Sequence, residues 1–150
     1  MKNVKIALIG CGYWGKNLAR IYSQLGALGA IVDTNTKRAK SYSKKYGVPC
    51  IDMDTMLSDP SIDGVVIASP AKCHKDQSLQ AIKAGKHVYV EKPLALSLSD
   101  GKIVCNAARV TNLTLMTGHL LQYHPTFITL RDMVERGELG ALRYAYSTRV

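Results

Sequence analysis

Three glycines near the start of the chain, Gly10, Gly12 and Gly15, have the spacing GxGxxG. Gly10 would permit a sharp turn, and Gly12 would let a pyrophosphate approach the backbone without meeting a Cβ. Gly15 would let the following helix pack closely on the preceding strand, and that helix would offer its free N–H groups and positive dipole end to the phosphates. Glycine-rich turns are common, but this one lies between a predicted strand and a predicted helix, which indicates a dinucleotide-binding site.

A carboxylate follows at the distance that such a site requires. Asp33 ends the second apolar run, 28–32, where it can accept hydrogen bonds from the adenosine ribose hydroxyls. The alternative is an aspartate that merely closes a β-turn. Asp33 would also repel a 2′-phosphate, which favours NAD over NADP as the cofactor. Lys37 and Arg38 follow closely and could reach a 2′-phosphate, so NADP remains the alternative cofactor.

Lys92 is the residue whose position suggests catalysis. It lies between Glu91 and Pro93, at the end of a predicted strand. An ammonium there can hydrogen-bond a substrate hydroxyl, help its proton to leave as a hydride departs, and stabilise developing oxyanion charge. A surface lysine in a loop is the alternative, but the predicted sheet places Lys92 at the ligand-binding crevice.

The elements that would position these residues alternate along the chain. Apolar runs predict buried strands, and apolar residues at helical spacing between them predict helices. The strands are expected at 4–9, 28–32, 48–51, 63–68, 87–90 and 113–117, and the helices at 14–25, 37–46, 52–57, 72–84 and 99–110.

This alternation predicts an α/β fold, a doubly wound parallel sheet with the strand order 3-2-1-4-5-6. Ligands of such sheets bind at the carboxyl edge, where the strand order reverses. The glycine turn, the pair Ser69-Pro70 and the triplet Glu91-Lys92-Pro93 each follow the carboxyl end of a predicted strand. We therefore expect these three segments to meet at one crevice.

Composition argues against several other classes of protein. The chain has 150 residues, 47% of them hydrophobic, with no apolar run of membrane-spanning length and no signal peptide, which predicts a cytoplasmic globular protein without a membrane partner. Its four cysteines are scattered without a Cys-x-x-Cys pair, so we expect reduced thiols and neither disulfides nor a metal site. The net charge of +9 is spread along predicted helices without a basic arm, which favours a solvated basic face over nucleic-acid binding.

Five segments of this chain together resemble the Gfo/Idh/MocA (glucose-fructose oxidoreductase and inositol dehydrogenase) family: GCGYWG at 10–15, Asp33, Ala68-Ser69-Pro70 with His74 after it, AGKHV at 84–88, and Glu91-Lys92-Pro93. The resemblance implies a Rossmann domain, NAD(P)-dependent oxidation or reduction of a sugar or cyclitol, Lys92 at the nicotinamide, and a cis peptide before Pro93. Members often have threonine in place of Ser69, but a hydroxyl remains. The candidate cofactor-binding residues are Gly10, Gly12, Tyr13, Trp14, Gly15, Asp33, Thr34, Arg38, Ser69, Pro70, His74, Glu91, Lys92 and Pro93.

A narrower resemblance concerns residues 118–125, GHLLQYHP. This stretch is similar to dehydrogenases that oxidise the 3-hydroxyl of UDP-N-acetyl sugars or their uronic acids in bacterial surface-polysaccharide synthesis. It implies a nucleotide-sugar substrate whose binding site is formed in part by His119, Tyr123 and His124. These three could equally be polar residues at a domain joint. An NADP-dependent sugar or inositol dehydrogenase and a non-catalytic dinucleotide-binding module are the alternative functions.

The last thirty residues are expected to begin a second domain. We place the dinucleotide-binding domain at 1–120 and the start of a truncated substrate and oligomerisation domain of α+β type at 121–150. That part should contain a helix ending at Gly137 and a strand over 142–150. The resemblance implies that the rest of the sugar pocket lies in this domain. The 150 residues should therefore bind NAD(H) without dehydrogenase activity. We also expect the full-length protein to form a homo-oligomer.

Overall fold

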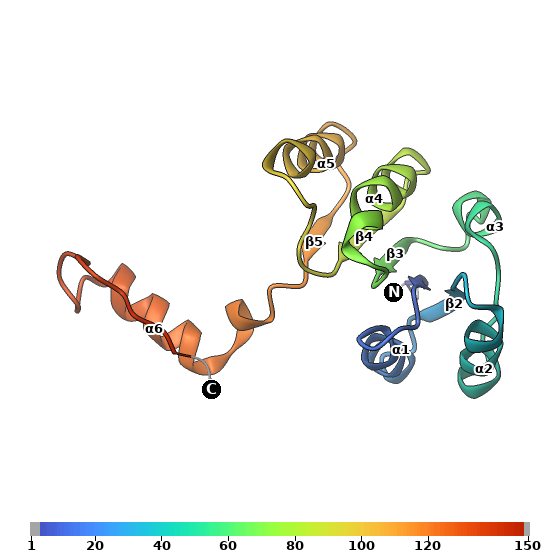
Figure 1. The fold of residues 1–150 in the computed structure, drawn as a ribbon, viewed down its shortest axis with the longest axis horizontal. Coiled ribbons are helices and arrows are strands. Elements are labelled where there is room, and N and C mark those ends of the chain that lie inside the picture. The colour runs from blue at the N-terminus through green and yellow to red at the C-terminus, as the bar shows by residue number, and fades with distance from the viewer. Residues whose placement is uncertain (1–3, 149–150) are drawn as a thin grey trace. The chain divides into compact units, whose positions relative to one another are not determined.

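A computed structural model describes residues 4–148, and within that range five parallel strands form one sheet with the order β2-β1-β3-β4-β5 (Figure 1). This arrangement confirms the predicted doubly wound α/β fold. Its elements up to residue 118 are β1 (Ile6–Ile9), α1 (Gly15–Gln24), β2 (Leu28–Val32), α2 (Thr36–Tyr46), α3 (Met53–Ser58), β3 (Gly64–Ile67), the 3-10 turn η1 (Ala71–Cys73), α4 (His74–Lys83), β4 (His87–Val90), α5 (Leu98–Val110) and β5 (Leu115–Thr117).

Each strand sends alternate side chains to opposite faces of the sheet, and helices bury both faces. In β1, Leu8 packs in one apolar cluster with residues of α1 and α2, while Ala7 and Ile9 pack in a second cluster with residues of α3, α4 and α5. Figure 1 shows α1 and α2 on one side of the sheet and α4 and α5 on the other. The apolar runs of the sequence are thus strands with helices on both sides.

The predicted third strand, 48–51, is only a single bridge in the structure. Cys50 pairs in parallel with Ile31, on the outer side of β2, and two hydrogen bonds hold this segment: Ile31 N–H to the Pro49 oxygen and Ile51 N–H to the Ile31 oxygen. Pro49 has no N–H to donate, so a longer ladder cannot form through it. The segment still has the position that the predicted strand order assigns to it.

Two of the helices that flank the site begin at a side-chain cap. Asn35 accepts a hydrogen bond from Arg38 N–H at the start of α2, and Ser97 accepts one from Asp100 N–H at the start of α5. The first cap fixes where Arg38 lies relative to the end of β2. The predicted helix 72–84 is divided here into η1 and α4, whose first residue is His74.

Residues 119–148 belong to a second compact unit. It contains the 3-10 turn η2 (Leu120–Tyr123) and α6 (Pro125–Glu135), whose first residue, a proline, needs no hydrogen-bond acceptor there. The predicted strand at 142–150 was wrong for residues 142–148, which have no regular structure, and residues 149–150 lie outside the described range. A strand needs a neighbouring strand to pair with, and residues 119–148 contain none.

Among residues 4–148, no helix has the length and apolar character needed to cross a membrane.

Candidate functional site

The glycine turn between β1 and α1 is packed so tightly that two of its positions exclude any side chain. Gly10 has φ +93°, and a Cβ on it would lie 2.8 Å from the Ser69 backbone nitrogen. A Cβ on Gly15 would collide with the Gly10 carbonyl oxygen. At Gly12, by contrast, a Cβ would meet nothing within 4 Å. The turn therefore presents an open backbone surface at Gly12, which fits the close approach of a pyrophosphate.

The Asp33 carboxylate, at the end of β2, is held by four hydrogen bonds. One oxygen accepts from Cys11 N–H at 2.7 Å and from Arg38 Nε at 2.9 Å, and the other accepts from Asn35 N–H at 2.7 Å and from Arg38 Nη2 at 2.8 Å. The bond from Cys11 joins the carboxylate directly to the glycine turn. Thr34, the next residue after Asp33, is exposed.

These contacts keep Asp33 ionised although its side chain is only 2% exposed. Burial alone would raise the pKa of the Asp33 carboxyl, but the hydrogen bonds from Arg38, Cys11 and Asn35 outweigh burial and hold the pKa below its ordinary value. The same pairing raises the pKa of the Arg38 guanidinium, which remains 42% exposed. The structure thus places a buried negative charge and a partly exposed positive charge side by side at the end of β2.

The thiol of Cys11 adds no charge to this region. Burial, with the neighbouring Asp33 carboxylate, raises the pKa of the Cys11 thiol to about 12. The thiol therefore stays protonated at neutral pH and serves as a small apolar side chain of the core.

His74, the first residue of α4, connects two loops of the site. Its buried ring lies with Nδ1 2.7 Å from the Pro93 carbonyl oxygen and Nε2 2.8 Å from the Ser69 carbonyl oxygen. Ser69 is further fixed by a 2.6 Å hydrogen bond from its hydroxyl to the Gln77 side chain. His74 therefore holds the loop after β3, which contains Pro70, against the loop after β4.

The loop after β4 contains the predicted catalytic lysine. The Lys92–Pro93 peptide bond is cis, as the family resemblance implies. The Lys92 side chain is exposed, and its ammonium makes no hydrogen bond or ion pair with any residue in the described range 4–148. Glu91 is buried, and its carboxylate accepts hydrogen bonds from Trp14, Tyr89 and the backbone of Lys92.

The register of the sheet brings these loops together. Ile9 of β1 pairs with Ile67 of β3, which pairs with Val90 of β4, so the three strands end at the same level. The loops that follow them contact one another through the close approach of the glycine turn to Ser69 and through the bridging His74 ring. The structure thus gathers the glycine turn and the Ser69 and Lys92 loops at one carboxyl edge, with Asp33 hydrogen-bonded to the turn.

The remaining candidate side chains, one in the glycine turn and three in the second unit, are exposed. Tyr13, in the glycine turn, is 85% exposed and carries the Lys16 ammonium 4.9 Å from its ring centroid. His119, Tyr123 and His124 belong to the second unit, around η2, where all three are exposed. Their predicted role in substrate binding stays a prediction.

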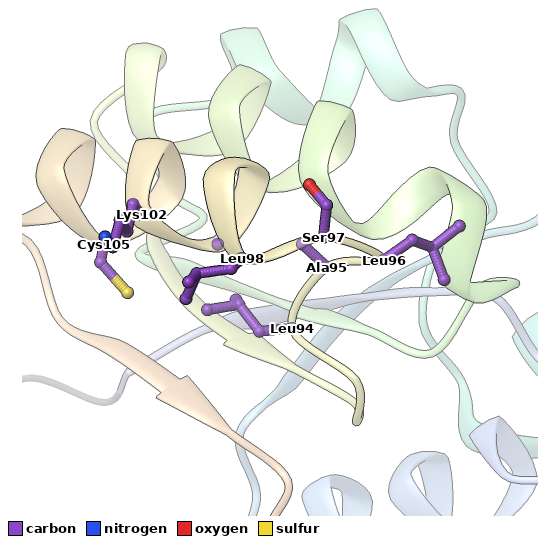
Figure 2. A pocket seen from close by; sticks show the side chains of 8 residues that line it. Leu94, Ala95, Leu96, Ser97, Leu98, Lys102 and Cys105 are labelled. Atoms are coloured by element: carbon purple, nitrogen blue, oxygen red, sulfur yellow. The ribbon is translucent and has the colours of Figure 1, made fainter.

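A hollow that the sequence did not predict lies beyond Pro93. It has a volume of about 470 Å³, and Figure 2 shows the loop and α5 side chains around it. Its lining consists of Leu94, Ala95, Leu96, Ser97, Leu98, Gly101, Lys102 and Cys105. The apolar run directly after Pro93 was the available signal. None of the predicted cofactor-binding residues lines this hollow, so we do not assign the dinucleotide to it.

A parallel sheet with a glycine turn after its first strand, a helix N-terminus at that turn and a carboxylate after its second strand defines a Rossmann domain that binds NAD(P). Residues 4–119 match the model of the oxidoreductase family with an NAD-binding Rossmann fold, Gfo/Idh/MocA. The chain belongs to this family.

Three similar proteins show how the family uses the fold. The chain is 31% identical to a scyllo-inositol 2-dehydrogenase (NAD(+)) of Bacillus subtilis strain 168 over 144 residues, 91% of this chain and 42% of the relative. A UDP-N-acetylglucosamine 3-dehydrogenase of Acidithiobacillus ferrooxidans superposes with a TM-score of 0.81 at 27% identity, covering 88% of this chain and 43% of that one. A 3-ketoreductase of Actinomadura kijaniata, in complex with NADP and TDP-benzene, has a TM-score of 0.82 at 25% identity, over 91% and 43%.

The chain spans between 35% and 45% of the length of the curated relatives it matches.

Replacing Asp33 by Asn tests whether the ionised Asp33 carboxylate raises the free energy of unfolding. Because the folded-state pKa of Asp33 is depressed, the ionised carboxylate stabilises the fold above its unfolded pKa, and this stabilisation is lost as pH falls through the folded pKa. We expect D33N to have a lower free energy of unfolding than the wild type at about pH 7, with a smaller difference at about pH 3. Urea unfolding followed by circular dichroism measures both values.

The exposed Asp54 on α3 supplies the matched control, since the same substitution there removes a carboxylate outside the site. A difference between D33N and the wild type that stays constant with pH would contradict the account of Asp33.

Proposed function

We propose that this chain is the dinucleotide-binding part of an NAD-dependent oxidoreductase that transfers hydride between a sugar hydroxyl and nicotinamide, with Lys92 as the catalytic residue. The carrying observation is the Lys92 loop itself. It lies at the same sheet edge as the glycine turn and presents an exposed ammonium without a protein partner in the described residues. The buried Lys86, by contrast, donates its ammonium protons to the carbonyl oxygens of Asp59 and Ile62 and so serves the fold.

The residues at the edge fit such a cofactor in separate parts. The open backbone at Gly12 and the N-terminus of α1 suit the pyrophosphate, and Asp33 with Thr34 lies where the adenosine ribose would be. Ser69, Pro70 and the Lys92 loop would then face the nicotinamide end, together with His74 as the residue that joins the loops. When bound, the nicotinamide supplies a hydride acceptor.

Lys92 would act on the substrate hydroxyl. Its ammonium can donate a hydrogen bond to the hydroxyl oxygen and stabilise the negative charge that develops there, and its amine form can take the hydroxyl proton. Both actions require the side chain to be solvent-accessible and unpaired before substrate arrives, as it is here. Residues from 121 onward would begin the domain that holds the sugar.

For the substrate we propose a UDP-N-acetyl sugar or its uronic acid, oxidised at C3. Two observations support this class: the GHLLQYHP stretch, with His119, Tyr123 and His124, and the similarity to a UDP-N-acetylglucosamine 3-dehydrogenase. The net charge of +9 also suits an anionic nucleotide sugar. The 31% identity to a scyllo-inositol dehydrogenase favours a cyclitol as the second candidate.

The full-length protein separates these candidates in one assay. We expect it to reduce NAD+ with UDP-N-acetylglucosamine or its uronic acid and to be much slower with scyllo-inositol, measured by NADH absorbance. Faster turnover of scyllo-inositol would replace the nucleotide sugar by the cyclitol. NADH binding without turnover of any sugar or cyclitol would favour the non-catalytic module.

We expect Lys92→Met in the full-length protein to reduce kcat by about 10²- to 10⁴-fold, because it removes a group that acts on the transferring proton. The Kd for NADH should stay close to the wild-type value, since an interaction made mainly in the transition state appears in the rate. Stopped-flow turnover and a fluorescence titration with NADH measure the two quantities.

Lys44→Met, in the exposed part of α2, is the matched control. A Lys92→Met variant that lost NADH binding but turned over normally at saturation would make Lys92 a cofactor anchor.

We further propose NAD(H) as the preferred cofactor. Arg38 would reduce this preference by favouring the binding of NADP(H). The Asp33 carboxylate is ionised and held rigidly by two backbone N–H groups, so it would repel a 2′-phosphate. The Arg38 guanidinium neutralises this charge and is exposed enough to turn toward a phosphate. The two residues therefore act in opposite directions on NADP(H).

Arg38→Ala should weaken NADPH binding more than NADH binding. We expect the Kd for NADPH divided by the Kd for NADH to rise about tenfold, which corresponds to about 1.4 kcal/mol. Titrations with both cofactors measure this ratio. Equal losses for the two cofactors would show that Arg38 does not discriminate between them, and tighter NADPH than NADH binding by the wild type would contradict the proposed preference.

A further inference from the structure

The carboxylate of Glu91 is occupied by groups of the protein. Glu91 is 7% exposed. Its Oε1 accepts one hydrogen bond from the Trp14 indole Nε1–H at 2.7 Å and another from the Tyr89 hydroxyl at 3.1 Å. Its Oε2 lies 3.3 Å from the Lys92 backbone nitrogen, which donates to it. The three donors to this carboxyl group are uncharged, and no ion pair to Glu91 occurs among residues 4–148.

The segment after β5 also packs against the Glu91 carboxylate. A Cβ on Gly118, the residue after β5, would lie 2.6 Å from the Tyr89 hydroxyl oxygen and 2.9 Å from Glu91 Oε1. Only glycine leaves room there for the carboxylate and the hydroxyl. The ends of β4 and β5 and the glycine turn after β1 thus pack around one buried carboxylate.

The bond from Trp14 connects two functional segments that are 77 residues apart. Trp14 directly precedes Gly15, the first residue of α1, whose N-terminus forms the candidate phosphate site. Glu91 directly precedes Lys92. A shift of the glycine turn would therefore be passed through one side-chain hydrogen bond to the backbone of the lysine loop.

We propose that Glu91 is a positioning residue that couples the glycine turn to Lys92, and that it is not a ligand of the cofactor. Trp14 and Tyr89 hold its carboxylate, and the carboxylate in turn fixes the backbone N–H of Lys92. This inference rests on the catalytic role proposed for Lys92, but the hydrogen bonds can be tested independently of it.

Two substitutions each remove one donor and keep an aromatic ring, Trp14→Phe and Tyr89→Phe. In the full-length protein we expect each to lower kcat about tenfold, as loss of a hydrogen bond to a charged group would, with a smaller change in the Kd for NADH. Glu91→Gln should lower kcat at least as much. Tyr46→Phe makes the same chemical change at a half-buried tyrosine of α2 that packs on Tyr42, and should leave kcat unchanged.

The distribution of effects decides the role. Weaker NADH binding with normal kcat at saturation would make Glu91 a cofactor ligand. Lower unfolding stability with normal kcat and Kd would make its hydrogen bonds purely structural. Either result overturns the proposal.

The indole N–H of Trp14 gives a readout that does not depend on turnover. Its resonance in a ¹H–¹⁵N spectrum of the full-length protein can be assigned by its absence in Trp14→Phe, and Trp14 is the single tryptophan of these 150 residues. Glu91→Gln and Tyr89→Phe should shift this resonance, and Tyr46→Phe should not. An unchanged resonance in Glu91→Gln would contradict the coupling, whereas absence of sugar turnover would contradict the proposed function alone.

Discussion

The close contact between the start of α1 and the end of β1 is the constraint on which the rest of the site depends. Gly15 lies against the Gly10 carbonyl, and Gly10 lies against the backbone of Ser69, with no space for a Cβ at either glycine. This packing aims the helix N-terminus along the carboxyl edge of the sheet. It also brings Cys11 N–H to Asp33 and the Trp14 indole to Glu91. A side chain at Gly10 would meet the backbone of Ala68 and Ser69, and one at Gly15 would meet the Gly10 carbonyl, so either would force the turn to shift.

Two buried carboxylates border the glycine turn, and their different partners suit different tasks. Asp33 is paired with the partly exposed guanidinium of Arg38 through two hydrogen bonds, so its charge is balanced within the protein. Glu91 is bound only by neutral donors from the surrounding segments, so it fixes backbone positions. Lys92, one residue further, stays exposed. The edge thus combines carboxylates held by the protein with an exposed ammonium that makes no hydrogen bond or ion pair within the described residues.

The two segments that differ from the predicted strands, 48–51 and 142–148, do so for one physical reason. A short apolar segment predicts a strand, but a strand forms only where a partner offers matching donors and acceptors. Residues 48–51 have such a partner on one side, and Pro49 limits the pairing to a bridge. Residues 142–148 have none within their unit.

The sequence by itself determined the strand and helix alternation, the glycine turn and the carboxylate after β2, because these depend on local periodicity and on the absence of side chains at fixed spacing. Only the tertiary structure decided which polar groups are engaged. Nothing in the spacing of Trp14 and Glu91, or of His74 and Pro93, indicates that they bond. Those contacts arise from the register of three parallel strands, which brings together loops distant in sequence, and register is a property of the assembled sheet.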